Sequence, residues 1–261
     1  MKKKTEQNNV YDVHASHSVG TPHTPTLAII MKRLIILILL ISNSVFAQFS
    51  FSDLQYINIE HSYLNGKFGF NKASKFQLIN RFCNDSIDCY KYEDPTTLIG
   101  YWNVNDKHKI EFHYTEAPSD DPTFIAVFNG KIILEESGTT LHFKGNTLYI
   151  EGNANSYFDK KRKFQFIDNS YQEVNQPFYH IGIKGKLNYQ IQIYKTDKFL
   201  EKVASLPRDY EVEVLIGQTG GEYNDLEKVL IKTEFGLIGW FNFKEVAFGK
   251  PLVDGLYYHG D

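Results

Sequence analysis

Cys83 and Cys89 are the only cysteines of the chain and the first residues to weigh for chemistry. They stand close together in the stretch FCNDSIDCYKY, with turn-forming residues between them. In an oxidising compartment such a pair closes a disulfide across a loop or hairpin. The alternative is that Cys89 is a thiolate nucleophile, which needs a histidine base within reach. The downstream candidates His108 and His113 lie in or beside a predicted strand, so we expect the disulfide.

The other reactive side chains form no catalytic or metal-binding motif. The sequence lacks a nucleophile elbow, a zinc-peptidase helix motif and a phosphate-binding loop. Oxygen-bearing side chains gather near the cysteines without the spacing of a calcium-binding EF-hand: Asn84, Asp85, Asp88, Glu93 and Asp94. The histidines away from this region are isolated or irregularly spaced: His14, His17, His23, His61, His142, His180 and His259. We therefore expect no catalytic residue, no metal site and no cofactor.

Residues 31–47, MKRLIILILLISNSVFA, have the pattern of a secretory signal peptide. Lys32 and Arg33 precede an unbroken apolar run, and small residues end the segment at Ala47. The apolar run is shorter than the roughly 20 residues that a membrane-spanning helix needs. We expect cleavage between Ala47 and Gln48, and a periplasmic or secreted protein with no stable membrane insertion afterwards. Met31 is then the expected start, and residues 1–30 a leader without structure.

Composition favours an exported β-protein over a nucleic-acid-binding one. The whole chain has a formal net charge of −3, and removal of residues 1–47 takes away more bases than acids. An acidic chain is a poor partner for nucleic acid or an anionic membrane surface. Aromatic residues make up 15% of the sequence, and Tyr and Phe favour β-strands. These features predict an all-β fold.

Residues 48–175 show the spacing of an antiparallel β-sandwich or meander. Turn signals such as Asn65-Gly66, Asn129-Gly130 and Lys144-Gly145-Asn146 alternate with short apolar stretches. A recurrence of about 8–12 residues is typical of such folds. The strands are predicted at residues 76–82, 98–104, 109–114, 123–128, 131–135, 139–143, 147–151, 163–167 and 171–174.

Residues 176–189 are predicted to link this first domain to a second one, residues 190–261. The second segment contains Tyr194, an apolar residue before Leu206-Pro207, a Val-x-Val-Leu strand at residues 212–215, and Lys-Thr with Gly-Trp at residues 232–240. This pattern resembles a bacterial SH3-like (SH3b) domain. The resemblance implies a small β-barrel with an extension at its C-terminal end.

The same resemblance implies a binding function. SH3-like domains of exported bacterial proteins generally recognise cell-wall peptides or proteins of the envelope, so the expected partner is a cell-wall peptide or glycan, or an envelope protein. Trp240 and Tyr194 are the candidate ligand-binding residues. Trp240 is either an anchor at the lip of the barrel or part of its core, and the need of a small domain for large buried side chains favours the core. The oligomeric state is left open.

Two other functions stay open beside non-catalytic binding. Bacterial SH3-like domains often accompany cysteine peptidases that cut cell-wall peptides, whose nucleophile lies in an Asp-Cys-Ser-Gly setting. Here Asp88-Cys89 is followed by Tyr90-Lys91, so half of that motif is missing. A structural or inhibitory partner of another secreted protein is the third possibility.

Overall fold

The regular structure of the described residues is almost entirely β-strand, as the composition predicts. The computed structural model describes residues 51–83, 90–92, 94–116, 121–220, 225–246 and 250–260. The one helical element of these residues is the 3-10 turn η1 (Phe243–Glu245). These residues therefore contain no helix that is long and apolar enough to cross a membrane. The strands are β1 (Gln55–Asn58), β2 (Lys67–Phe70), β3 (Phe76–Cys83), β4 (Thr96–Asn103), β5 (Lys109–Thr115), β6 (Thr123–Phe128), β7 (Lys131–Ser137), β8 (Thr140–Lys144), β9 (Thr147–Gly152), β10 (Lys160–Ile167), β11 (Ser170–Glu173), β12 (Tyr179–Lys186), β13 (Ile191–Tyr194), β14 (Lys202–Leu206), β15 (Glu211–Gly220), β16 (Asp225–Thr233) and β17 (Ile238–Asn242).

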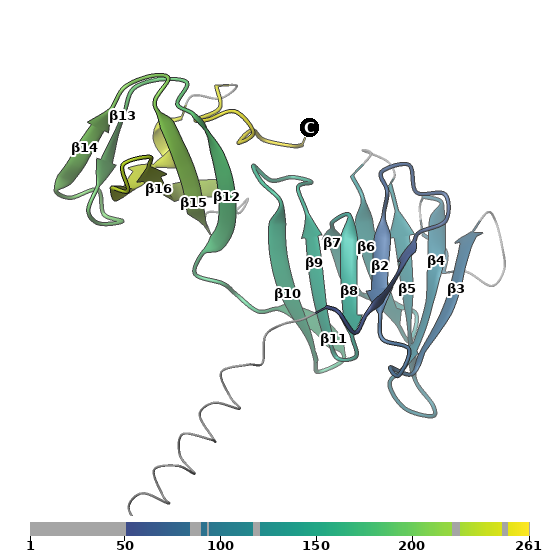
Figure 1. Ribbon diagram of the computed structural model, residues 1–261. Helices are drawn as coiled ribbons and strands as arrows, with labels where there is room; N and C mark the ends of the chain where they lie inside the picture. The colour runs from purple at the N-terminus through teal and green to yellow at the C-terminus, as the bar shows by residue number, and fades with distance from the viewer. Residues whose placement is uncertain are drawn as a thin grey trace, which may run out of the picture. The chain divides into compact units, whose positions relative to one another are not determined.

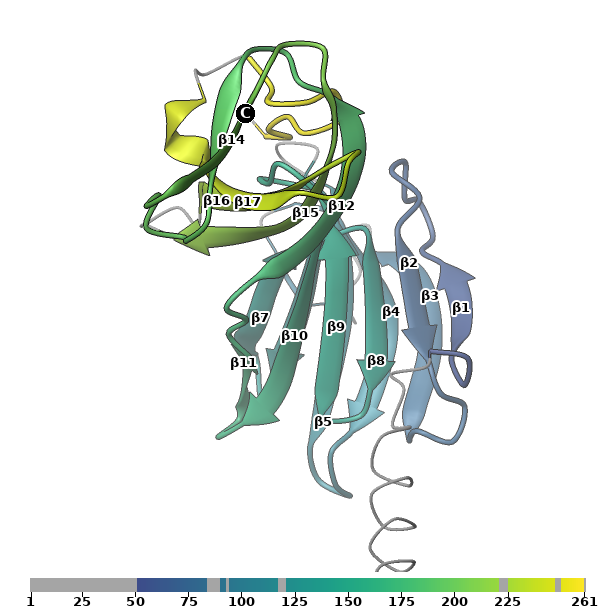
Figure 2. The same cartoon turned by 60° about the vertical axis from the view of Figure 1, so that its left-hand side comes forward.

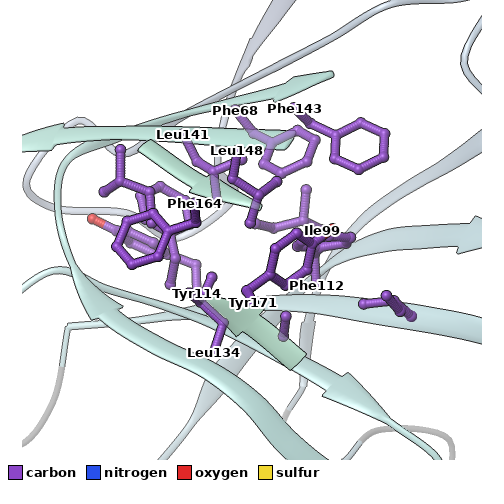
Figure 3. Packing of buried hydrophobic residues seen from close by; sticks show 14 of the residues in the cluster. Phe68, Ile99, Phe112, Tyr114, Leu134, Leu141, Phe143, Leu148, Phe164 and Tyr171 are labelled. Atoms are coloured by element: carbon purple, nitrogen blue, oxygen red, sulfur yellow. The ribbon is translucent and has the colours of Figure 1, made fainter. Parts of the chain in front are cut away.

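Two sheets share the first hydrophobic core. One has the strand order β1-β2-β8-β9-β10-β11 and the other the order β3-β4-β5-β6-β7, and Figures 1 and 2 show them as two layers. Their inward side chains meet in a single cluster that is rich in phenylalanine. Phe68 from the first sheet contacts Phe112 from the second, with ring centroids 5.8 Å apart (Figure 3). Alternating apolar residues on both sheets produce this shared core.

The hairpin turns form where the sequence places residues that tolerate positive φ. Asn129 and Gly130 have φ angles of 50° and 71°, and they join β6 to β7 through the pair Phe128 and Lys131. Asp168 and Asn169, at 50° and 65°, join β10 to β11 in the same way. Positive φ at both central positions defines the turn whose twist matches a hairpin. The prediction of hairpins at these positions is confirmed.

One strand pair departs from the antiparallel arrangement that the turn signals predict. β2 pairs with β8 in parallel, with Phe68 opposite Leu141. Asn65-Gly66 does not form a two-residue hairpin turn, because β1 pairs with β2 across the longer connection 59–66. Hairpin signals report only neighbouring strands, so a pair between strands this far apart in the sequence leaves no local pattern.

The third sheet has the strand order β12-β15-β16-β17-β13-β14. β12 lies in the segment predicted as a linker, and it pairs with β15 through a register shift between His180 and Ile183. The second hydrophobic cluster packs against this sheet, and it also includes Phe158 from the connection between β9 and β10. Among the described residues no strand pair joins the edges β12 and β14, so the pairing is that of an open sheet.

Candidate functional site

Trp240 and Tyr194 lie directly opposite each other on neighbouring strands. They form the registered pair between β17 and β13. The two side chains therefore project from the same face of the sheet. Both are half-buried. The structure thus brings together the two residues that the sequence singles out for ligand binding.

The prediction that Trp240 belongs to the core is wrong. Its neighbour Phe241 is 2% exposed and lies in the second hydrophobic cluster. Successive residues of a strand point to opposite faces, so a core position for Phe241 sends Trp240 to the outer face. Phe241 supplies the large buried ring that the small domain needs.

Trp240 is the centre of an apolar row that crosses the outer face of the third sheet. The register pairs Ile216 with Leu230, Leu230 with Trp240, and Trp240 with Tyr194. All four side chains are half-buried, and Trp240, Leu230 and Ile216 lie outside the hydrophobic cluster on the other face. We call these four residues the Trp240 row.

Two exposed apolar side chains extend this row. The ring of Phe178, which precedes β12, lies 5.6 Å from the Trp240 ring and is 39% exposed. Ile238, two positions before Trp240 on β17, is 49% exposed. A partly exposed aromatic group among aliphatic neighbours is a common anchor at binding surfaces. The arrangement can bind an apolar or aromatic side chain of a partner.

Thr233 holds the hairpin between β16 and β17, which lies beside the row, in one conformation. The amide of Gly236 donates to the Thr233 carbonyl at 2.9 Å, and the amide of Leu237 donates to the Thr233 hydroxyl at 2.9 Å. Gly236 has a φ of 98°, which favours glycine. The hairpin tip exposes 84% of Phe235.

Ion pairs flank the row. The Lys232 ammonium lies 3.5 Å from a Glu213 carboxylate oxygen, and the Lys228 ammonium lies 3.2 Å from Asp197. The outer face therefore has a mixed polar border and an apolar centre, as protein interfaces commonly do.

Of the two cysteines, only Cys83 lies among the described residues. Cys83 is buried at the end of β3 and has no free thiol. Cys89 lies outside the described residues, so its bond to Cys83 stays a prediction. The expected cleavage site at Ala47 and Gln48 also lies outside them.

His142 takes part in a hydrogen-bonded chain on the first sheet. The Tyr56 hydroxyl lies 2.7 Å from Nδ1 of His142, and Oε1 of Glu151 lies 3.5 Å from Nε2. The hydrogen bond to His142 holds the pKa of Glu151 below its ordinary value, whereas burial raises the pKa of Tyr56. Gly69 makes the contact possible, because a Cβ there would lie 2.6 Å from the Tyr56 ring. The neutral hydroxyl and the paired carboxylate support a structural role.

The histidines weighed as bases for Cys89 are placed differently from each other. His113 is 1% exposed and lies between Thr96 and Glu111, with nitrogen-to-oxygen distances of 3.5 Å and 3.4 Å. Its hydrogen bond lowers the pKa of Glu111. His108 contacts the Asn105 side chain in an exposed turn. Among the described residues, no three His, Cys, Asp or Glu side chains are grouped as a metal site.

Comparisons with known proteins identify no relative of this chain. No family model, no curated protein and no solved structure matches it.

Sequence reasoning missed four members of the face around Trp240: Leu230, Ile216, Ile238 and Phe178. Leu230 and Ile216 alternate with core residues along β16 and β15, so the strand period could have placed them on the outer face. Phe178 precedes its strand in a segment predicted as linker. No local pattern indicates that its ring reaches Trp240.

Proposed function

We propose that this chain is an exported, non-catalytic binding protein of the bacterial envelope, and that the Trp240 row is its recognition surface. The expected partner is a cell-wall peptide or an envelope protein. The observation that carries the proposal is the direct pairing of Tyr194 with Trp240 in an apolar row on the outer face of a sheet.

We also propose a specific fold for each part of the chain. The first two sheets would be a β-sandwich, and the third sheet would curl into an SH3-like barrel. Two glycines of the resemblance support this assignment. Gly236 has positive φ in the last hairpin, and a Cβ on Gly239 would lie 2.9 Å from Ile193. Both positions therefore favour glycine, as the tight hairpin and close strand packing of an SH3-like barrel would.

Replacement of Trp240 by alanine tests the function. Because Trp240 is half-buried on the outer face, the variant should keep a thermal transition close to that of the wild type. It should lose sedimentation with purified cell wall or binding to an envelope extract. Tyr257→Ala, at a 49% exposed ring outside the row, is the matched control and should bind normally. Undiminished binding by Trp240→Ala would remove the row from the proposal.

The rival function is a hydrolase that uses Cys89. The absence of a free thiol at Cys83 favours the disulfide. Alkylation without reductant, followed by mass spectrometry, separates the two functions. We expect neither cysteine to be modified, whereas an alkylated Cys89 would support the hydrolase.

A further inference from the structure

A second candidate site lies in the first part of the chain, away from the Trp240 row. It is a pocket of about 350 Å³ between the connection 59–66 and the strands β3, β4 and β5. Four aromatic rings, one proline, two threonines and one carboxylate line it: His61, Tyr63, Phe82, Pro95, Thr97, Tyr114, Thr115 and Glu116. Among the described residues, no Lys or Arg lines this pocket.

Glu116 fixes the wall that the connection 59–66 forms. Its Oε1 accepts hydrogen bonds from the Ser62 hydroxyl at 2.7 Å and the Leu64 amide at 3.0 Å. Its Oε2 accepts one from the Tyr63 amide at 2.8 Å, and the Tyr114 hydroxyl donates to Oε1 at 3.2 Å. The loop is thereby held in place before any ligand arrives, which lowers the entropy lost on binding.

The Glu116 carboxylate carries a charge that no base neutralises among the described residues. Partial burial tends to raise its pKa, but the hydrogen bonds from Leu64, Ser62 and Tyr63 outweigh burial and hold the pKa below its ordinary value. The carboxylate is therefore ionised at neutral pH. All four of its donors are uncharged, and within the described part of the chain no Lys or Arg forms an ion pair with it.

Aromatic residues line the same pocket as this carboxylate. The His61 and Phe82 rings lie 4.6 Å apart, and the Tyr63 side chain is 87% exposed beside them. The faces of such rings attract cations because the ring quadrupole is negative there. Aromatic walls with one uncompensated carboxylate are complementary to an organic cation.

The remaining polar groups disfavour other ligand classes. The Thr97 hydroxyl already donates to the Glu60 carbonyl at 2.8 Å, and the Thr115 hydroxyl donates to the Pro95 carbonyl at 3.0 Å. Few donors are left for the hydroxyl groups of a neutral sugar, and an anion would meet the Glu116 charge. A primary amine needs several acceptors, whereas a quaternary ammonium group needs none.

We propose that this pocket binds a quaternary ammonium group, with Tyr63 and Phe82 contacting its methyl groups and Glu116 supplying the opposite charge. This activity is independent of the function proposed for the Trp240 row. The group could come from a small solute or from a choline lipid headgroup, and the chemistry of recognition is the same for both.

Choline and 3,3-dimethylbutan-1-ol provide a matched pair of probes, because they share a shape and differ in charge. Titration of the purified protein, followed by amide NMR shifts, should show choline binding about fivefold or more tightly than the alcohol. Tyr63→Ala should weaken choline binding about fivefold or more while leaving the fold intact, since its ring is exposed. Tyr257→Ala should leave it unchanged. Glu116→Gln should reduce the preference for the charged probe.

Equal affinity for the two probes would overturn the proposal, as would the absence of saturation up to about 100 mM choline. If Glu116→Gln fails to fold, the comparison of probes and Tyr63→Ala still decide the question. Sedimentation with phosphatidylcholine vesicles identifies the source of the group. Tyr63-dependent sedimentation would assign the site to a lipid headgroup, and binding of choline alone would assign it to a solute.

Discussion

Neighbouring residues of one strand have opposite surroundings in this protein, and Trp240 and Phe241 show the effect most clearly. Phe241 fills the second core, whereas Trp240 reaches the outer face beside Phe178. A shift of the β17 register by one residue would exchange them. The glycine at position 239 helps to hold the register, because any larger residue would contact Ile193.

Tyr189 offers a test of hydrogen bonding at single-residue scale. Its hydroxyl is buried and has no partner among the described residues, and burial raises its pKa to about 12. Tyr189→Phe should therefore leave the free energy of unfolding unchanged or raise it by up to about 1 kcal/mol. Urea denaturation measures the change. Tyr56→Phe is the control and should lower stability by about 1 kcal/mol, because that hydroxyl bonds to His142. An equal loss in both variants would contradict the prediction.

Glu151 should make the stability of the fold depend on pH. Its hydrogen bond to His142 lowers its pKa in the folded state. A lowered folded pKa stabilises the fold above the unfolded value of about 4.3, and this contribution disappears as the pH falls through the folded pKa. The loss of stability between about pH 5 and pH 3 should thus be smaller in Glu151→Gln than in the wild type. Denaturation curves at several pH values would show this difference. An equal loss of stability in the variant and the wild type would refute it.

At the scale of elements, the hairpin β6–β7 depends on its turn. Gly130 has a φ of 71°, and an added Cβ would meet nothing within 4 Å. Gly130→Ala should thus cost about 1 kcal/mol of stability through backbone strain alone. Lys131→Ala, beside the turn, should change stability by less than about 0.5 kcal/mol. Chemical denaturation of both variants tests this, and a neutral Gly130→Ala would mean that the turn relaxes.

The elements that follow from local pattern were predictable, and those that depend on distant partners were not. The strand predicted at residues 123–128 coincides with β6, because alternation and the Asn-Gly turn both act within a few residues. The parallel pair β2–β8 and the strand β12 were missed. β12 contains Gly182 with positive φ beside its register shift, which obscures the alternation.

Only part of the candidate site was predictable from the sequence. The resemblance identified Trp240 and Tyr194, and the structure pairs them. The burial of Trp240 could not be decided from composition, since either neighbouring aromatic could fill the core. The pocket at Glu116 had no signal in the sequence, because its walls come from four separate segments.

At the scale of the whole molecule, two separate cores predict two unfolding events. Phe143 is 0% exposed in the first cluster, and Phe241 is 2% exposed in the second. Each alanine substitution should cost about 3–5 kcal/mol. Calorimetry should show that Phe143→Ala lowers one thermal transition and Phe241→Ala the other. A single transition that both variants lower equally would show that the cores unfold together.

The parallel pair between β2 and β8 should form late while the chain folds. β2 cannot complete its sheet until residues 140–143 are available, whereas β4, β5 and β6 pair with strands next to them in the sequence. Long-range pairing carries a larger loop-closure entropy and forms later. In pulse-labelling hydrogen exchange, the amides of β4–β6 should gain protection before those of β1 and β2. Until then the apolar side chains of Phe68 and Phe70 are exposed, so a slow step at this point leaves the newly made chain open to aggregation or to capture by a chaperone.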